Sequence, residues 1–109
     1  MTPRERAARK VIEILDSPFL QALAEPARLE VLRVLLLHGA SDVGQIASHL
    51  PQDRSVISRH LATLEEAGIV HGTKQGRRRI YQLDGLGFLR TFERILAETR
   101  ALVPLCCPP

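Results

Sequence analysis

Residues 55–70 read S-V-I-S-R-H-L-A-T-L-E-E-A-G-I-V and decide the fold of the chain. The stretch predicts an amphipathic helix, because Ile57, Leu61 and Leu64 recur at helical spacing and share one inward face. Arg59 lies on the opposite face among small polar residues. A helix with such an outer face suits the major groove of duplex DNA.

The residues that follow, 71–84, read H-G-T-K-Q-G-R-R-R-I-Y-Q-L-D and predict a β-hairpin. Residues 69–70 and 80–83 are the strand candidates. Gln75-Gly76 lies between them and suits a tight turn, because glycine tolerates a positive φ. A hairpin in this place would lie beside the helix as a wing.

The turn of this hairpin is basic. Four cationic residues fall within six positions: Lys74, Arg77, Arg78 and Arg79. Glu65 and Glu66 lie outside the cluster. A local basic cluster is the electrostatic footprint of a phosphate contact, although a solvated turn can have the same composition. Because side chains alternate along a strand, we expect Arg77 and Arg79 to share one face and Arg78 to take the other.

A short helix before residue 55 completes a helix-turn-helix. Asp42 and Gln45 have the spacing of a capping box, and V-G-Q-I-A-S-H-L at 43–50 predicts a helix that Pro51 ends. Asp53 suits the cap of the second helix. We therefore expect a helix-turn-helix over about 42–68 and a wing over about 69–83.

Amphipathic helices are predicted at both ends of the chain, over about 3–16 and 85–103. Pro3 suits the first position of the first helix, and Pro104 is expected to end the last one. Both helices carry apolar stripes, and Phe88 and Phe92 form an i, i+4 aromatic pair in the last helix. Such helices need a surface to cover, either in their own domain or on a second subunit.

Length and composition place the chain in one domain over residues 1–109. A chain of 109 residues has a modest core and is marginal alone, so a dimer is plausible. The net charge of +3 is weak evidence by itself. We see no apolar run long enough to span a bilayer and no secretory signal, so we expect a cytoplasmic protein without membrane contact, its cysteines mainly reduced.

Three stretches of the sequence closely resemble the ArsR/SmtB family of bacterial winged-helix repressors. They are L-A-E-P-A-R-L-E-V-L-R-V-L at 23–35, the helix sequence at 55–70 and G-R-R-R-I-Y-Q-L at 76–83. The resemblance covers roughly residues 15–100. It implies a mainly α (α+β) winged helix-turn-helix fold and a homodimer packed through the first and last helices. It also implies binding to a palindromic operator, and release by a small effector, most often a toxic metal or metalloid ion.

The resemblance places the second helix in the major groove, the basic residues suggest phosphate or minor-groove contacts for the wing, and Gln45 at the start of the preceding helix is a weaker phosphate candidate. The expected contact residues are Gln45, Ser55, Val56, Ser58, Arg59, His60, Lys74, Arg77, Arg78 and Arg79. Arg59 can bind guanine in a bidentate manner or clamp a phosphate. For Ser58 the alternative is a tolerated small polar residue, and for His60 it is packing at the helix surface.

Two sensing sites that are usual in the family are absent from the sequence. The first helix of the helix-turn-helix reads S-D-V-G-Q-I-A and has no cysteine. The last helix has Asp84, but no histidine follows it. Zinc, nickel or cobalt sensing through the last helix is therefore disfavoured, and no cofactor is expected to be required.

The remaining candidate for a sensor is the pair Cys106 and Cys107. Neighbouring thiolates suit soft ions, and As(III) is the best guess among them, with other soft metal ions as alternatives. Inorganic arsenic(III) prefers three sulfurs, whereas an organoarsenical(III) needs only two, so both forms remain open. A redox switch is a further reading. In that case an intersubunit disulfide is favoured, because neighbouring Cα atoms lie about 3.8 Å apart, below the usual disulfide span. A dispensable tail is the plainest alternative.

The leading hypothesis is thus a DNA-binding transcriptional repressor that a thiophilic metalloid or metal releases from its operator. The alternatives are a winged-helix repressor with a redox or non-metal effector, and a protein-interaction module that has lost DNA binding. The intact R-R-R sequence argues against the interaction module. We do not expect an enzyme, because the sequence shows no Ser/His/Asp set, phosphate loop or paired carboxylates.

Overall fold

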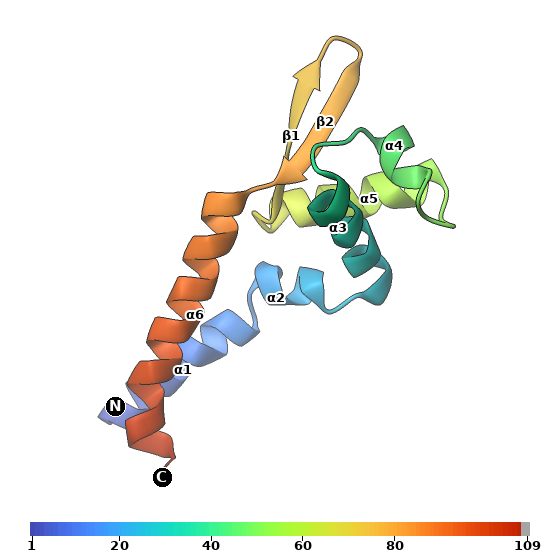
Figure 1. Ribbon diagram of the computed structural model, residues 1–109. Coiled ribbons are helices and arrows are strands. Elements are labelled where there is room, and N and C mark those ends of the chain that lie inside the picture. Colours follow the sequence, from blue (N-terminus) through green and yellow to red (C-terminus); the bar gives the residue numbers. More distant parts are fainter. Residues whose placement is uncertain (108–109) are drawn as a thin grey trace.

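The computed structural model describes residues 1–107, and these form a mainly helical chain with one β-hairpin (Figure 1). The elements in chain order are α1 (Pro3–Leu15), α2 (Pro18–Leu23), α3 (Pro26–His38), α4 (Val43–Ala47), α5 (Arg54–Glu66), β1 (Val70–Gln75), β2 (Arg78–Leu83) and α6 (Gly85–Cys106). The predicted winged helix-turn-helix fold, with α4 and α5 as its two helices and β1–β2 as its wing, is confirmed.

Side-chain caps fix the beginnings of the helices, as the sequence predicts. Thr2 accepts a hydrogen bond from the backbone N–H of Glu5, and Asp53 accepts one from Val56. The capping box of α4 is complete, because the N–H of Gln45 donates to Asp42 at 2.8 Å and the N–H of Asp42 donates to Gln45 at 2.9 Å. Each cap satisfies a backbone donor that the helix itself leaves without a partner.

The core lies among α2, α3, α4, α5 and the base of the hairpin. Ile57, Leu61 and Leu64, the predicted inward face of α5, are all fully buried. Their burial fixes the rotation of α5 about its own axis, so the opposite face is turned to solvent.

The hairpin is longer than the sequence predicts. Its strands pair antiparallel from Val70 opposite Leu83 to Gln75 opposite Arg78, whereas we expected strands only over 69–70 and 80–83. The residues H-G-T-K-Q at 71–75 are mostly exposed and polar, so they give no alternating apolar signal. Reciprocal backbone hydrogen bonds of 3.0 and 2.9 Å between Ser41 and Tyr81 attach the wing to the loop before α4.

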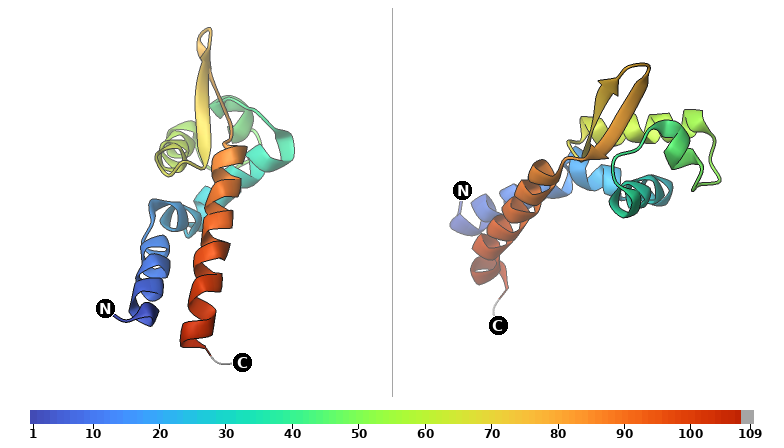
Figure 2. Two further views of the ribbon diagram at one scale, coloured as in Figure 1. Left: turned by 90° about the vertical axis from the view of Figure 1, so that its left-hand side faces the viewer. Right: turned by 45° about the horizontal axis from the view of Figure 1, so that its top comes forward.

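The two terminal helices run alongside each other, and the hairpin projects from the opposite end of the molecule (Figures 1 and 2). Arg94 of α6 lies 3.7 Å from Glu13 of α1. Phe19 of α2 contacts Phe88 and Phe92, with ring centroids 5.7 and 5.5 Å apart, and so joins α6 to the core. No residue of α6 is classed as buried, although much of the helix is apolar.

Two predicted helix ends are wrong. Pro104 does not end the last helix, because α6 continues through it to Cys106, and the N–H of Cys107 donates to Val103 at 3.0 Å. Pro104 has no N–H to donate to the preceding turn, but the N–H of Cys107 still closes the last turn of the helix behind it. The first helix of the helix-turn-helix ends at Ala47 rather than at about residue 50.

Candidate nucleic-acid interface

The outer face of α5 presents the residues that the sequence predicts for the major groove. Ser55, Ser58 and Arg59 are exposed, and the fully buried residues of α5 lie on its other side. The hydroxyl of Ser55 donates to the cap Asp53 at 2.7 Å. This bond, together with the N–H of Val56, lowers the pKa of the Asp53 carboxyl from its ordinary value. The cap of the helix is therefore a carboxylate at neutral pH.

Two of the predicted contact residues on α5 are less open to solvent. Val56 and His60 are both half-buried. Burial lowers the pKa of His60 below its ordinary value, and the charge of Arg28 on α3 acts in the same direction. His60 therefore favours its neutral form and lies at the edge of the exposed face.

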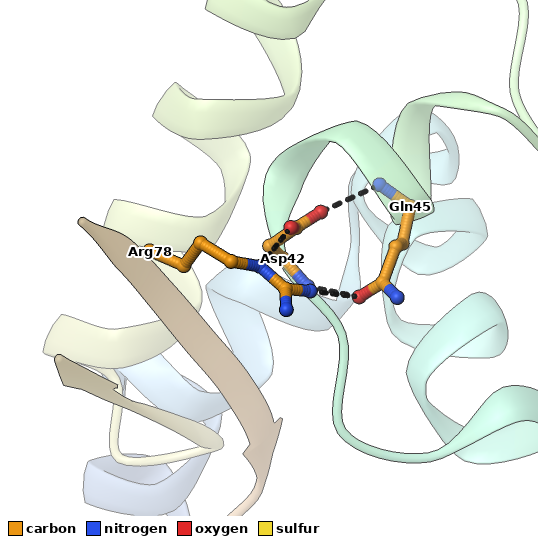
Figure 3. Close-up of polar contacts among 3 residues, drawn as sticks. All are labelled: Asp42, Gln45 and Arg78. Carbon is orange, nitrogen blue, oxygen red and sulfur yellow. Dashed lines mark hydrogen bonds and ion pairs between the residues drawn. The ribbon is translucent and has the colours of Figure 1, made fainter. Parts of the chain in front are cut away.

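The wing arginine Arg78 is bound to the start of α4 (Figure 3). Its Nε lies 2.7 Å from Oδ2 of Asp42, and its Nη2 donates to Oε1 of Gln45 at 3.2 Å. The pKa of Asp42 is lowered from its ordinary value, first by the N–H of Gln45 and then by the side chain of Arg78. One carboxylate thus caps α4 and holds the hairpin against it.

Arg79 is bound to a different helix. Its Nη2 lies 2.9 Å from Oε2 of Glu65 on α5, and the same oxygen accepts the N–H of Gly72 at 3.0 Å. The guanidinium also lies 5.6 Å from the ring centroid of Tyr81. Glu65, which lies outside the basic cluster in sequence, is therefore one of its partners in space.

Arg77 does not share a strand face with Arg79, contrary to the alternation we expected. It lies in the turn beside Gly76, which has a φ of +64°. Lys74 lies on β1, opposite Arg79 in the register. Among residues 1–107, neither Arg77 nor Lys74 makes an ion pair, and both side chains are exposed.

A hollow of about 580 Å³ lies between the start of α4, the start of α5 and the turn of the hairpin. Its lining includes Asp42, Gly44, Gln45, Arg54, Arg77 and Arg78, and we call it the α4–wing hollow. Arg54 was missed as a site residue. It directly follows the cap Asp53, so from sequence alone Arg54 looks like an ordinary residue at the first position of a helix. The packing of α4 against α5 brings Arg54 to the wing.

The two cysteines lie at the end of α6, far along the chain from the wing. Their sulfur atoms are joined in a disulfide, with the Cα atoms 3.8 Å apart. This differs from our expectation that a bond within the pair is disfavoured. Within residues 1–107 no group of three or more His, Cys, Asp and Glu side chains is arranged to hold a metal ion. The chemistry of the pair, once reduced, fits a ligand that needs two thiolates and no third protein group.

Among residues 1–107, no helix combines the length and the apolar character that a bilayer crossing requires.

Comparison with known proteins bears on the same region of the chain. A family model described as "Bacterial regulatory protein, arsR family" matches residues 25–71. The HTH-type transcriptional regulator Rv2034 of Mycobacterium tuberculosis is 44% identical over 73 residues, which are 65% of this chain and 67% of that protein. The HTH-type transcriptional regulators CmtR of Mycobacterium bovis and NmtR of Mycobacterium tuberculosis are 44% and 38% identical to this chain and match over 52% of their own length.

Two solved structures are similar over most of the chain. One is an ArsR family transcriptional regulator, with a TM-score of 0.67 and 31% identity, covering 85% of this chain and 93% of the other. The second is titled a possible transcriptional regulator for arsenical resistance, with a TM-score of 0.60 and 37% identity over 77% of this chain and 82% of the other. With these similarities and the fold above, the chain belongs to the ArsR family of transcriptional regulators.

Proposed function

We propose that this chain is a DNA-binding transcriptional repressor in which α5 enters the major groove and the hairpin lies along the neighbouring phosphates. The observation that carries the proposal is the shared outer surface of α5 and the wing. Arg59 and the serines of α5 are exposed there, and so are the cationic side chains around Gly76. The transcriptional regulators similar to this chain support it.

The roles of the side chains follow from their chemistry. Arg59 is the main reader of bases, because a guanidinium can bind guanine with two parallel hydrogen bonds. Ser55, Ser58 and Gln45 are small or polar neighbours that can bond to phosphates, with Val56 and His60 at the edge. On the wing, Lys74 and Arg77 meet phosphates directly. Arg78 and Arg79 add positive charge while their ion pairs hold the hairpin in place.

We also propose that the repressor is a homodimer on a palindromic operator. Ile12 and Leu15 of α1 are about half exposed or more, as are Leu89 and Leu96 of α6. Apolar faces of this size on two adjacent helices support contact with a second subunit. A two-fold dimer presents its two recognition helices to two half-sites of opposite orientation.

The proposed effector is a thiophilic ion at Cys106 and Cys107, best guessed as arsenic(III) in inorganic or organic form. The vicinal pair at the end of α6 supports this, as does the similar structure titled for arsenical resistance. The ion would bind the reduced pair, so the disulfide must first accept two electrons and two protons from two cellular thiols, which become a disulfide themselves. An organoarsenical(III) would then replace two hydroxide groups by two sulfurs and release two molecules of water.

The disulfide itself favours a second candidate effector. In that version oxidation of Cys106 and Cys107 is the signal, and no ion is needed. Both versions act by linkage, since each would favour a dimer geometry in which the recognition helices no longer match successive major grooves.

The test is fluorescence anisotropy on the duplex upstream of the gene, with protein that has been reduced and then separated from the reductant without exposure to air. Wild type is titrated with arsenite, with phenylarsenite and with a mild oxidant. The matched control is the variant Cys106→Ser/Cys107→Ser, which should bind DNA with wild-type affinity and fail to respond. Release by phenylarsenite alone supports a two-thiolate site, and release by the oxidant alone supports the redox version. A double variant that still responds would exclude the tail as the sensor.

A further inference from the structure

The α4–wing hollow contains two guanidinium groups without carboxylate partners. Among residues 1–107, Arg54 and Arg77 make no ion pair, whereas Arg78 in the same hollow is bound to Asp42. Both oxygens of Asp42 are already used, Oδ1 by the N–H of Gln45 and Oδ2 by Arg78. The hollow therefore carries a net positive charge that the protein itself does not neutralise.

Arg54 is held at the hollow by close packing against α4. A Cβ atom placed on Gly44 would stand 3.1 Å from Nη2 of Arg54 and 3.3 Å from its Cζ. The absence of a side chain at Gly44 thus lets the guanidinium lie directly over the first turn of α4. Arg77 enters the hollow from the other side, at the turn of the hairpin.

The position of the hollow between α5 and the wing indicates its ligand. Most of its lining belongs to the start of α4, with Arg54 from the start of the helix that we place in the major groove and Arg77 and Arg78 from the wing that we place along the backbone. A DNA strand bound by both the helix and the wing would pass over the hollow. A guanidinium binds phosphate oxygens with paired hydrogen bonds and keeps its charge at any physiological pH.

We propose that Arg54 and Arg77 together bind one backbone phosphate of DNA in the α4–wing hollow. The inference rests on the DNA-binding function proposed above and adds Arg54 to its contact residues. Arg78 and Asp42 are the positioning residues of this site, because their ion pair sets the distance between α4 and the wing. A free phosphate ion has the same chemistry, and the experiment separates the two sources.

The experiment measures the affinity of full-length Arg54→Gln, Arg77→Gln and the double variant for the operator and for a scrambled duplex, over a range of salt concentrations. Arg4→Gln is the matched control, since Arg4 is an exposed arginine on α1 at the far end from the wing (Figure 2). Circular dichroism and thermal unfolding confirm that each variant is folded.

Each single substitution should weaken binding severalfold on both duplexes alike, because a phosphate contact carries no sequence information. In the double variant the slope of log K against log salt should become shallower by about 2, because the dimer loses one phosphate contact per subunit. Arg4→Gln should change neither quantity. A loss confined to the operator would identify Arg54 as a base reader and overturn the proposal.

Two further outcomes distinguish a failure of the phosphate site from a failure of the proposed DNA binding. If wild type shows no salt-dependent binding to either duplex, the DNA-binding function itself fails. If wild type binds and both variants behave like Arg4→Gln, only the phosphate site fails. A parallel NMR titration follows the Gly44 amide with inorganic phosphate at constant ionic strength. Saturation at submillimolar phosphate, with DNA binding of Arg54→Gln unchanged, would assign the hollow to a free anion and overturn the proposal.

Discussion

Arg78 and Arg79 are neighbours in the chain, but carboxylates on two different sides of the wing bind their guanidinium groups. Asp42 holds Arg78 at the start of α4, and Glu65 holds Arg79 on α5. Because the backbone of a strand turns successive side chains to opposite faces, two adjacent arginines can brace the hairpin from both sides. Both arginines thus fix the position of the wing through their ion pairs, and their positive charges also attract DNA.

The variant Asp42→Asn tests whether Arg78 acts mainly as a brace. The substitution removes one negative charge from the surface, which by charge alone should strengthen DNA binding. We expect the affinity for the operator to fall instead, because the wing loses its ion pair to α4. Fluorescence anisotropy measures the affinity. The comparison is Glu65→Gln, which removes the carboxylate partner of Arg79. Tighter binding by Asp42→Asn would show that Arg78 is a phosphate contact that Asp42 restrains.

His60 makes the stability of the fold depend on pH. Its pKa is lowered below the ordinary value of 6.5 by burial first and by Arg28 second. The unfolded chain therefore binds a proton more readily than the folded one. The contribution of His60 is fully present above pH 6.5 and is lost as the pH falls through the lower folded-state pKa. Urea midpoints at pH 7.5 and pH 5 should differ less in His60→Gln than in wild type, and equal differences would contradict this account.

At the scale of elements, the parts that could be predicted are those that local sequence controls. The caps Asp42 and Asp53 and the inward face of α5 depend on residues within one or two helical turns, and the structure has all of them. The hairpin was predicted too short because its paired polar residues carry no hydrophobic pattern. The ion pair of Arg78 joins residues 36 positions apart, and the position of Arg54 depends on helix packing, so neither leaves a local signal.

The hairpin depends on one backbone conformation at its turn. Gly76 has a φ of +64°, a region where a β-branched side chain is strained by about 1–2 kcal/mol. Gly76→Val should therefore lower the hydrogen-exchange protection of the amides in β1 and β2 while the amides of α5 keep theirs. Affinity for DNA should fall as well, since Lys74 and Arg77 lose their fixed places. Unchanged protection of the hairpin would show that the turn can adopt another conformation.

At the scale of the whole molecule, the chain is elongated and has different surfaces at its two ends. Its principal extents are 53 × 24 × 23 Å, with the wing at one end and the paired helices α1 and α6 at the other (Figure 2). The wing end is polar and basic. The helical end exposes apolar side chains on both helices, which accords with the proposed second subunit.

Leu96→Glu tests the proposed dimer. Leu96 is 53% exposed on α6, so a charge there leaves the core intact but would be buried in the dimer interface. We expect a folded monomer by analytical ultracentrifugation at concentrations where wild type is a dimer. Leu37→Glu is the matched control, because Leu37 is 79% exposed on α3 and lies outside the helical end. A dimeric Leu96→Glu protein would place the interface elsewhere.

The central claim is that α5 and the wing together bind DNA. The most direct measurement is the affinity of wild type and Arg59→Ala for the operator and a scrambled duplex between about 50 and about 200 mM salt. Two phosphate contacts per subunit, one shared by Arg54 and Arg77 and one made by Lys74, predict a log–log slope of about −4 for the dimer. Arg59→Ala should lose about 10-fold or more on the operator and much less on the scrambled duplex, as expected for a lost base contact of about 1–3 kcal/mol. Binding that does not change with salt, or equal losses on both duplexes, would contradict the account.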